Sequence, residues 1–286
     1  MPGVQDRVIV VTGAGGGLGR EYALTLAREG ASVVVNDLGG SRDGTGAGHN
    51  MADQVVNEIK EAGGRAVANY DSVAESDGAA NIIKTALDEF GAVHGVVSNA
   101  GILRDGTFHK MTFENWDAVL KVHLYGGYNV IRAAWPHFRE QSYGRVVVAT
   151  STSGLFGNFG QTNYGAAKLG LVGLINTLAQ EGAKYNITAN ALAPIAATRM
   201  TQDILPPEVF EKLTPDFVAP VVAYLCTEEC ADSGSVFIVG GGKVQRAALF
   251  QNDGVNFDQP PSVQEVGAHW SEITDLSAAQ KAGFKL

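Results

Sequence analysis

Residues 8–19, with the sequence VIVVTGAGGGLG, decide the fold, because a run of β-branched residues passes directly into a glycine-rich segment. A helical pattern follows over residues 18–28, so we expect a strand, a tight turn and a helix. Glycines at this junction permit the turn and let backbone N–H groups approach a diphosphate at the helix N-terminus. We assign to dinucleotide binding Gly13, Gly17, Leu18 and Gly19. For this loop taken alone, a plain strand-to-helix turn is the alternative.

Strand-like and helical stretches alternate along most of the chain. We predict strands over residues 8–11, 32–35, 66–68, 93–97, 145–149 and 236–239, and helices over residues 18–28, 54–61, 79–90, 116–138 and 164–183. This alternation is typical of an α/β protein with a doubly wound parallel sheet and crossover helices. We expect a single domain of this kind over residues 1–246, followed by a C-terminal extension over residues 247–286.

The extension contains few motifs. Val266, Trp270 and Ile273 are spaced so that they predict one helix. Three roles stay open for it: packing on the body, packing on a neighbouring subunit, or covering a substrate cleft.

Charge and composition exclude several classes of function. The formal net charge is −9, whereas neutralising nucleic-acid phosphates needs a dense basic face, so we expect no nucleic-acid partner. We find neither a signal-peptide pattern nor a run of about 20 apolar residues, which predicts a cytoplasmic protein without a membrane partner. Cys226 and Cys230 lie four residues apart in a helical pattern. Structural zinc needs four ligands, so we interpret them as reduced, packed thiols and expect no metal.

The strand ends supply the remaining cofactor candidates. Asp37 ends the second strand, where a carboxylate can accept a hydrogen bond from a ribose 2′-hydroxyl and repel a 2′-phosphate, which favours NAD over NADP. The ends of parallel strands converge on the cofactor crevice of such a sheet. We therefore add the residues after the third and fourth strands: Asp71, Ser72, Val73, Asn99, Ala100 and Gly101. A cap or turn is the alternative for each of them singly.

A third group of residues predicts acid–base chemistry. Tyr164 and Lys168 are four residues apart at a predicted helix start, so their side chains share one face. A phenol with a pKa of about 10 is a poor base near neutrality, and we expect the ammonium of Lys168 to lower that pKa. Ser151 follows a predicted strand and can hydrogen-bond the same substrate oxygen. Hydride transfer between NAD and a secondary alcohol or ketone is the reaction that this set predicts.

These motifs together resemble the short-chain dehydrogenase/reductase superfamily over about residues 5–245. The resemblance rests on Gly13, Gly17 and Gly19, on residues 99–101, and on Ser151 with Tyr164 and Lys168. It implies a Rossmann-type fold, binding of the nicotinamide ribose by Lys168, and cofactor contacts from Pro194 and Thr198. It also implies pairing of subunits through two long helices, as a homodimer or homotetramer. Residues 194–200 depart from the family pattern by lacking the glycine that usually follows the proline.

Longer strings are similar to the (3R)-hydroxyacyl-CoA dehydrogenase unit of peroxisomal multifunctional enzyme type 2, also called D-bifunctional protein. They are residues 35–40, 68–73, 101–105, 122–124 and 157–164. This resemblance implies a 3-hydroxyacyl-CoA as substrate. His123 stands where the superfamily usually has an asparagine that supports a proton relay. It either replaces that relay as a catalytic residue or is a satisfied helix histidine.

Two other functions are compatible with parts of the sequence. The first is a hydroxysteroid or general secondary-alcohol dehydrogenase. CoA phosphates need local cations such as Arg199, Lys243 or Arg246, so charge reversal there should raise KM only for CoA substrates. The second is a catalytically silent regulator that senses NAD, against which the complete set of Ser151, Tyr164 and Lys168 speaks.

Overall fold

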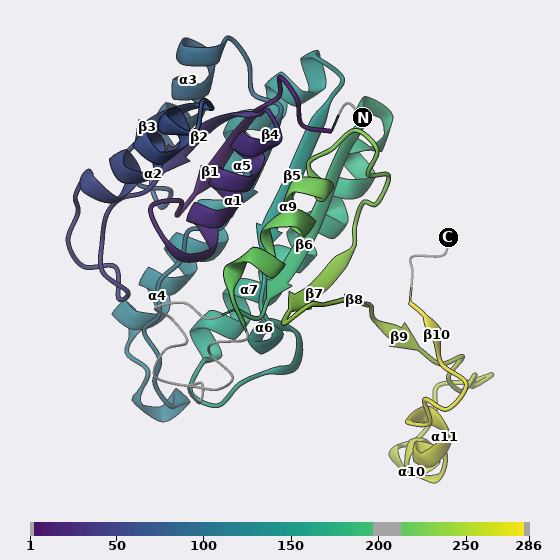
Figure 1. The fold of residues 1–286 in the computed structure, drawn as a ribbon. Coiled ribbons are helices and arrows are strands. Elements are labelled where there is room, and N and C mark those ends of the chain that lie inside the picture. The colour runs from purple at the N-terminus through teal and green to yellow at the C-terminus, as the bar shows by residue number, and fades with distance from the viewer. Residues whose placement is uncertain (1–2, 197–212, 283–286) are drawn as a thin grey trace. The chain divides into compact units, whose positions relative to one another are not determined.

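The computed structural model describes residues 3–196 and 213–282, and it divides into two compact units, residues 1–245 and 246–286. The strands of the main sheet are β1 Val8–Thr12, β2 Ser32–Asn36, β3 Arg65–Asn69, β4 Gly95–Ser98, β5 Gly144–Ala149, β6 Ile187–Pro194, β7 Val236–Gly240 and β8 Lys243–Ala247. Their spatial order is β3-β2-β1-β4-β5-β6-β7-β8, and β1 to β7 pair in parallel (Figure 1). The predicted Rossmann-type, doubly wound α/β fold is thereby confirmed.

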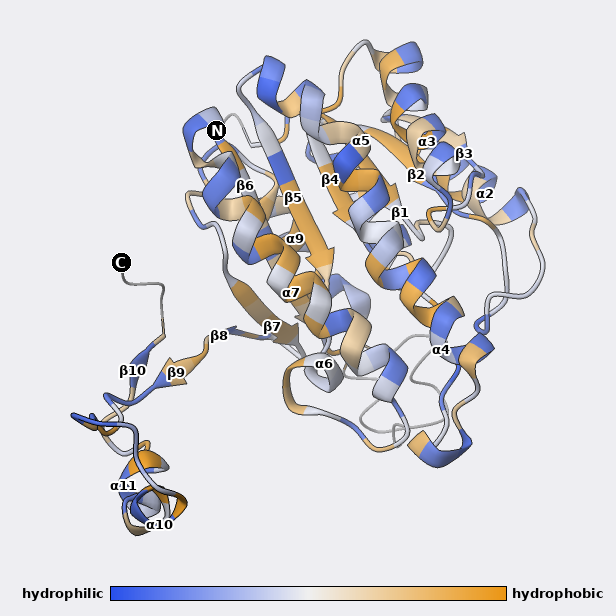
Figure 2. Ribbon diagram, turned by 180° about the vertical axis from the view of Figure 1, so that it is seen from behind, coloured by the Kyte–Doolittle hydropathy of each residue, from blue (hydrophilic) through white to orange (hydrophobic). Residues whose placement is uncertain are grey.

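Helices cover both faces of this sheet. They are α1 Gly17–Arg28, α2 Asn50–Glu61, α3 Ser76–Phe90, α4 Phe113–Leu120, α5 Gly126–Glu140, α6 Thr152–Phe156, α7 Thr162–Gly182 and α9 Ala219–Leu225, with the short 3₁₀ turns η1 Phe108–Lys110, η3 Ala183–Tyr185 and η4 Pro215–Phe217. One layer contains α1, α2 and α9, and the other contains α3, α5 and α7 (Figures 1 and 2). Between these layers β1, β2, β4 and β5 are buried along their whole length, as strands covered on both faces require.

The single long helix predicted over residues 116–138 contains a distinct turn. α4 continues into a π-helical turn, η2 Lys121–Tyr125, and then into α5. His123 lies at the centre of this turn and is buried. A π turn accommodates one residue more than an α-helical turn does, and such turns are frequent at functional sites.

Several elements were absent from the sequence-based prediction, among them β6, β8 and α6. β6 lies between β5 and β7, yet its sequence ITANALAP is poor in the residues that favour strands, so its conformation depends on its neighbours in the sheet. α6 is only five residues long. The predicted helix around the cysteines ends at Leu225, so Cys226 and Cys230 do not share a helix face; both are buried free thiols.

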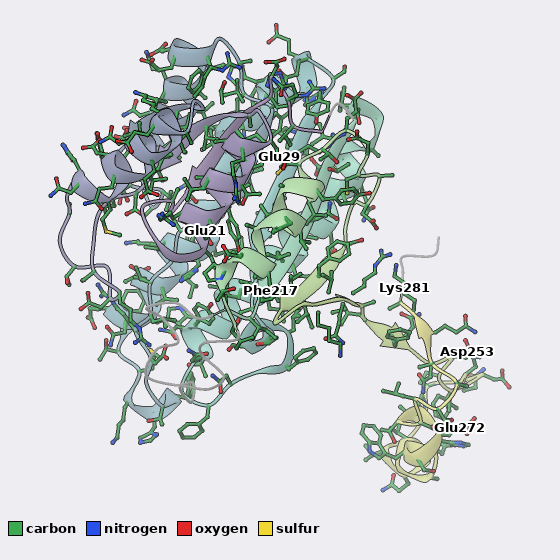
Figure 3. All side chains as sticks on the ribbon, in the orientation of Figure 1. Glu21, Glu29, Phe217, Asp253, Glu272 and Lys281 are labelled. Carbon is green, nitrogen blue, oxygen red and sulfur yellow. The ribbon has the colours of Figure 1, made fainter. Side chains whose placement is uncertain are left out.

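The C-terminal unit also differs from its prediction. Instead of one helix it has α10 Val263–Ala268 and α11 Trp270–Ile273, because His269 leaves helical geometry with φ −97° and ψ 6°. A short antiparallel pair joins β9 Phe250–Gln251 to β10 Gln280–Lys281. The labelled side chains Asp253, Glu272 and Lys281 are exposed (Figure 3). None of its described residues is buried, so this unit has no core of its own within residues 246–282.

Two features are absent from residues 3–196 and 213–282. No helix there is long and apolar enough to cross a bilayer. No group of three or more histidine, cysteine or acidic side chains comes together there in a way that could hold a metal ion.

Candidate active site

A cleft of about 410 Å³ lies at the carboxyl ends of β1, β2 and β4. The strand order reverses between β1 and β4, and open α/β sheets bind ligands at such a switch point. The predicted cofactor residues in its lining are Gly13, Gly17, Leu18, Asp37, Asp71, Ser72, Val73, Asn99, Ala100 and Gly101. Other predicted residues, namely Gly19, Tyr164, Lys168 and Pro194, lie outside this lining.

Glycine is required at two points of the loop after β1. Gly13 has a φ of 65°, and a Cβ added there would lie 2.7 Å from the Cα of Ala100. A Cβ at Gly19 would lie 2.1 Å from the Gly13 carbonyl oxygen and 2.7 Å from Asn99 Nδ2. The loops after β1 and β4 therefore approach each other closely because these positions carry no side chain.

Thr12 fixes this approach. It is buried at the end of β1, and its hydroxyl oxygen accepts hydrogen bonds from the backbone N–H groups of Asn99 and Ala100, both at 3.1 Å. The Asn99 side chain in turn donates to the carbonyls of Thr12 and Gly13, each at 3.2 Å. Sequence reasoning did not single out Thr12, although a polar residue that ends the apolar run 8–11 was the available signal.

Asp37 follows β2 with a half-buried side chain. Its Oδ2 accepts a hydrogen bond from the Gly15 N–H at 2.8 Å, and its Oδ1 accepts one from the Gly39 N–H at 2.7 Å. Each carboxylate oxygen has two lone pairs, so both can still accept from a sugar hydroxyl. The carboxylate therefore fits a ribose with a free 2′-hydroxyl and opposes one with a 2′-phosphate.

The turn after β3 brings Asp71, Ser72 and Val73 to the same cleft. Asn36 at the end of β2 donates from Nδ2 to the carbonyl of Asp71 at 2.9 Å. Asn129 of α5 donates from Nδ2 to the carbonyl of Val73 at 3.0 Å. Amide side chains from two other elements thus hold the backbone of this turn in place.

Ser151, Tyr164 and Lys168 come together where β5 meets α6 and α7. Ser151 is the N-cap of α6: its oxygen accepts a hydrogen bond from the Ser153 N–H at 3.1 Å, and its side chain also hydrogen-bonds Tyr164. Tyr164 and Lys168 occupy the first two turns of α7, and Lys168 Nζ lies 5.5 Å from the centroid of the tyrosine ring. Asn163 fixes the helix start by donating from Nδ2 to the carbonyl of Arg104 at 2.9 Å.

The protonation of this group differs from the prediction. Burial lowers the pKa of Lys168 to about 7, and its Nζ donates to the carbonyl of Ala149 at 2.5 Å. Burial also raises the pKa of Tyr164, which the hydrogen bond with Ser151 opposes only in part. The expectation that Lys168 lowers the phenol pKa is therefore wrong for this structure. Burial is the largest influence on this phenol, the charge of Asp105 adds to it, and Lys168 is not among the influences. The sequence does not show burial.

His123 lies against Tyr164. Its Nε2 is 2.8 Å from the carbonyl oxygen and 3.1 Å from the backbone nitrogen of Ile102, and its buried Nδ1 has no partner among the described residues. The ring meets Tyr164 edge-on, with centroids 5.1 Å apart. Burial, and then the charge of Lys168, hold the pKa of His123 well below its usual value, so the ring is neutral.

The remaining predicted residues are Pro194, Thr198, Arg199 and Lys243. Pro194 is the last residue of β6 and is in register with Val239 of β7. Thr198 and Arg199 lie outside the described residues. Lys243 is an exposed residue of β8.

Comparisons with known proteins agree with this geometry. The family model for short chain dehydrogenases matches residues 7–208. Over the full length of both proteins, the chain is 88% identical to Rv0148 of Mycobacterium tuberculosis, whose name gives the short-chain dehydrogenase/reductase type and no substrate. It is 50% identical to peroxisomal multifunctional enzyme type 2 of Mus musculus over 278 residues. That match covers 96% of this chain but only 37% of the mouse enzyme.

A solved structure extends the comparison to the fold. It is a 7α-hydroxysteroid dehydrogenase complexed with NADH and 7-oxo glycochenodeoxycholic acid. It aligns with a TM-score of 0.75 and 25% identity, covering 84% of this chain and 94% of that one. With its matching family model, sheet order and glycine-rich cleft, the chain belongs to the short-chain dehydrogenase family and is an oxidoreductase.

Proposed function

We propose that the chain oxidises the 3-hydroxy group of a (3R)-hydroxyacyl-CoA to a 3-oxo group, with NAD as the hydride acceptor. The convergence of Ser151, Tyr164 and Lys168 at a sheet edge that also holds a cleft fitted to NAD carries this proposal. The substrate class is supported by the 50% identity to the mouse multifunctional enzyme and by the strings that resemble its (3R)-hydroxyacyl-CoA dehydrogenase unit.

NAD(H) is the cofactor that the family and the cleft indicate. The diphosphate would be held by Gly13, Gly17, Leu18 and Gly19, and the adenosine ribose by Asp37. Asp71, Ser72 and Val73 would lie beside the adenine, and Asn99, Ala100 and Gly101 would line the cleft after β4. The nicotinamide end would be held by Lys168, Pro194 and Thr198. When bound, the nicotinamide ring accepts or supplies the hydride.

Side chains of the protein accept the alcohol proton and orient the substrate oxygen. The oxygen of Tyr164 accepts the alcohol proton during oxidation, and Ser151 hydrogen-bonds the same substrate oxygen and orients it. Because burial raises the pKa of Tyr164, its phenol is protonated at neutral pH, which suits donation to a ketone. Oxidation needs the deprotonated form, so we expect its rate to rise with pH above neutrality.

We propose that His123 acts through its neighbours as a positioning residue. Its neutral ring supports the backbone at Ile102 and packs edge-on against Tyr164. The buried Nδ1 without a partner among the described residues distinguishes this histidine from one whose hydrogen bonds are all satisfied.

The deciding experiment measures NADH formation with matched (3R)- and (3S)-hydroxyacyl-CoA compounds and with free hydroxysteroids. We expect turnover with the (3R) thioesters and little with their (3S) partners. Turnover of free sterols alone would replace the proposal by a hydroxysteroid dehydrogenase, a function that the 7α-hydroxysteroid dehydrogenase structure favours. NAD binding without turnover of any compound would indicate the regulator.

We further propose that the protein forms a homodimer or homotetramer through η2, α5 and α7. Three large side chains there are exposed in the single chain: Tyr125 at 54%, Tyr128 at 49% and Leu169 at 49%. Burying such groups against a second copy would be favourable. Light scattering on the purified protein measures this directly, and a monomer would contradict it. The cytoplasmic location stays a prediction.

A further inference from the structure

The segment between β2 and α2 forms a strap, defined here as residues 38–48. Its two ends are joined by a hydrogen bond from the Gly48 N–H to the Leu38 carbonyl at 2.9 Å. Its middle is held by Asp43, whose Oδ1 accepts hydrogen bonds from the Ser41 hydroxyl at 2.6 Å and from the Thr45 N–H at 3.0 Å. These bonds lower the pKa of Asp43 to about 2. The strap is therefore a folded loop with internal structure.

The strap is attached to the segment after β4. The Leu103 N–H donates to the Arg42 carbonyl at 3.0 Å, and Arg104 Nε donates to the Asp43 carbonyl at 2.9 Å. Gly44 packs against Ile102, since a Cβ added there would lie 3.0 Å from its Cγ2. Two hydrogen bonds and one close contact thus join segments about 60 positions apart in sequence.

This attachment closes one wall of the cofactor cleft. The strap contributes Leu38, Gly40, Ser41, Arg42 and Gly44 to the lining, next to Asp37. Arg104 belongs to the same lining. A dinucleotide held by Asp37 and the glycine-rich loop would therefore lie against the strap.

The segment that holds the strap also reaches the catalytic tyrosine. The carbonyl of Arg104 accepts the hydrogen bond from Asn163, the residue before Tyr164. Asp105 Oδ2 accepts one from Gln161 Nε2 at 2.8 Å, and the Gly106 N–H donates to the Gly160 carbonyl at 2.8 Å. Residues 102–106 are thus hydrogen-bonded to the strap on one side and to the start of α7 on the other.

We propose that Arg104 is a positioning residue that keeps the strap closed over bound NAD(H). Retention of the cofactor is thereby linked to the ordering of residues 102–106, the segment beside Tyr164. The Arg104 side chain holds the strap, while its carbonyl holds the start of α7. Cofactor release then requires the bond between Arg104 and Asp43 to break. This inference does not depend on which hydroxy compound is the substrate.

Replacement of the guanidinium tests the proposal. Arg104→Met removes the bond to Asp43 but keeps the backbone carbonyl that holds Asn163. We expect NADH to dissociate about tenfold faster from this variant, since one hydrogen bond from a charged donor is lost. The rate is measured by stopped-flow fluorescence when bound NADH is displaced by excess NAD, without any substrate.

A matched control separates the bond from the overall charge of the protein. Lys110→Met removes one positive charge from the neighbouring turn η1, whose lysine is exposed and lies outside the cleft lining. We expect its NADH dissociation rate to equal that of the wild type. Equal rates in all three proteins would overturn the proposal, and so would equal acceleration in both variants, which would mean that charge alone retains NADH.

Hydrogen exchange provides a second test on the unaltered protein. NADH should slow amide exchange in peptides covering residues 38–48 and residues 103–106, including the Leu103 and Gly106 amides that donate across the two junctions. In Arg104→Met the protection of both segments should be reduced together. If NADH protects only the glycine-rich loop of the wild type, the strap does not close over the cofactor and the proposal is overturned. This result needs only the wild-type protein, so it stands even if Arg104→Met fails to fold.

Discussion

The cleft that we propose for the cofactor and the start of α7 are built differently. The cleft is shaped by backbone groups, by glycines and by Asp37, a carboxylate that stays half-buried. At the start of α7, Lys168 is buried together with His123 and Tyr164 is half-buried, and burial is the main influence on their pKa values. Substitutions in the cleft should therefore change binding by degrees, whereas substitutions at α7 should change protonation and turnover.

The largest effect is expected from Tyr164→Phe, which removes the group that we propose exchanges the proton. We expect kcat to fall by about 10²- to 10⁴-fold while NADH affinity stays nearly unchanged. Steady-state kinetics and fluorescence titration measure the two quantities. Tyr224→Phe, at an exposed tyrosine of α9, is the control and should retain full activity. Normal turnover in Tyr164→Phe would remove the phenol from the mechanism.

Lys168→Met tests the buried ammonium through stability. The folded protein has a Lys168 pKa of about 7 and the unfolded chain one near 10.5, so between these values the unfolded chain binds a proton that the folded one does not. This group therefore makes the wild-type free energy of unfolding rise from pH 7 to pH 10.5. The full rise would be roughly 4–5 kcal/mol as an upper limit, at about 1.4 kcal/mol per unit.

The variant should lack that rise. Urea unfolding at several pH values across this window, in both proteins, measures it. All other titrating groups are shared, so the difference between the two stability curves isolates Lys168. Curves that run parallel from pH 7 to pH 10 would show that burial does not depress this pKa.

Asp37→Ala tests the cleft itself. It removes both the acceptor for the ribose hydroxyl and the charge that opposes a 2′-phosphate, so we expect the preference for NAD over NADP to fall by about 10- to 100-fold. The ratio of kcat/KM for the two cofactors measures it. Asp77→Ala removes an exposed charge from the first turn of α3 and should leave the ratio unchanged. An unaltered ratio in Asp37→Ala would show that Asp37 only shapes the turn after β2 and does not select the cofactor.

The smallest effect is expected at His123. His123→Leu removes the bond to Ile102, and we expect kcat to fall by up to about tenfold with NADH affinity preserved. His123→Asn keeps a polar group near that carbonyl and should recover part of the loss. Equal kcat in the wild type and in His123→Leu would identify an ordinary helix histidine.

The sequence predicted most reliably what depends on local pattern. The loop after β1 and the carboxylate of Asp37 follow from a strand that passes into glycines and from an acidic strand end, and the structure places both in the cleft. Ser151, Tyr164 and Lys168 also come together as their spacing suggested, because α7 carries two of them on one face and β5 delivers the third.

The sequence failed where the outcome depends on distant parts of the chain. β6 is a strand because of β5 and β7, despite its alanines. The pKa of Tyr164 is raised because several elements together bury its side chain. The strap has no periodic pattern that could have predicted its contact with Arg104. In each case the deciding interaction joins residues that are far apart in the chain.

Because η2 is a π-helical turn, the position of His123 depends on the number of residues in this turn. Successive residues of an α-helix are rotated by about 100°, and a π turn accommodates one residue more than the regular spiral does. Deleting Lys121 or Val122 would restore the regular spiral and change the rotation of His123 relative to α4, so that His123 would no longer face Tyr164. Relatives with a one-residue gap at this point should therefore carry a different group against their tyrosine, whatever residue they align with His123.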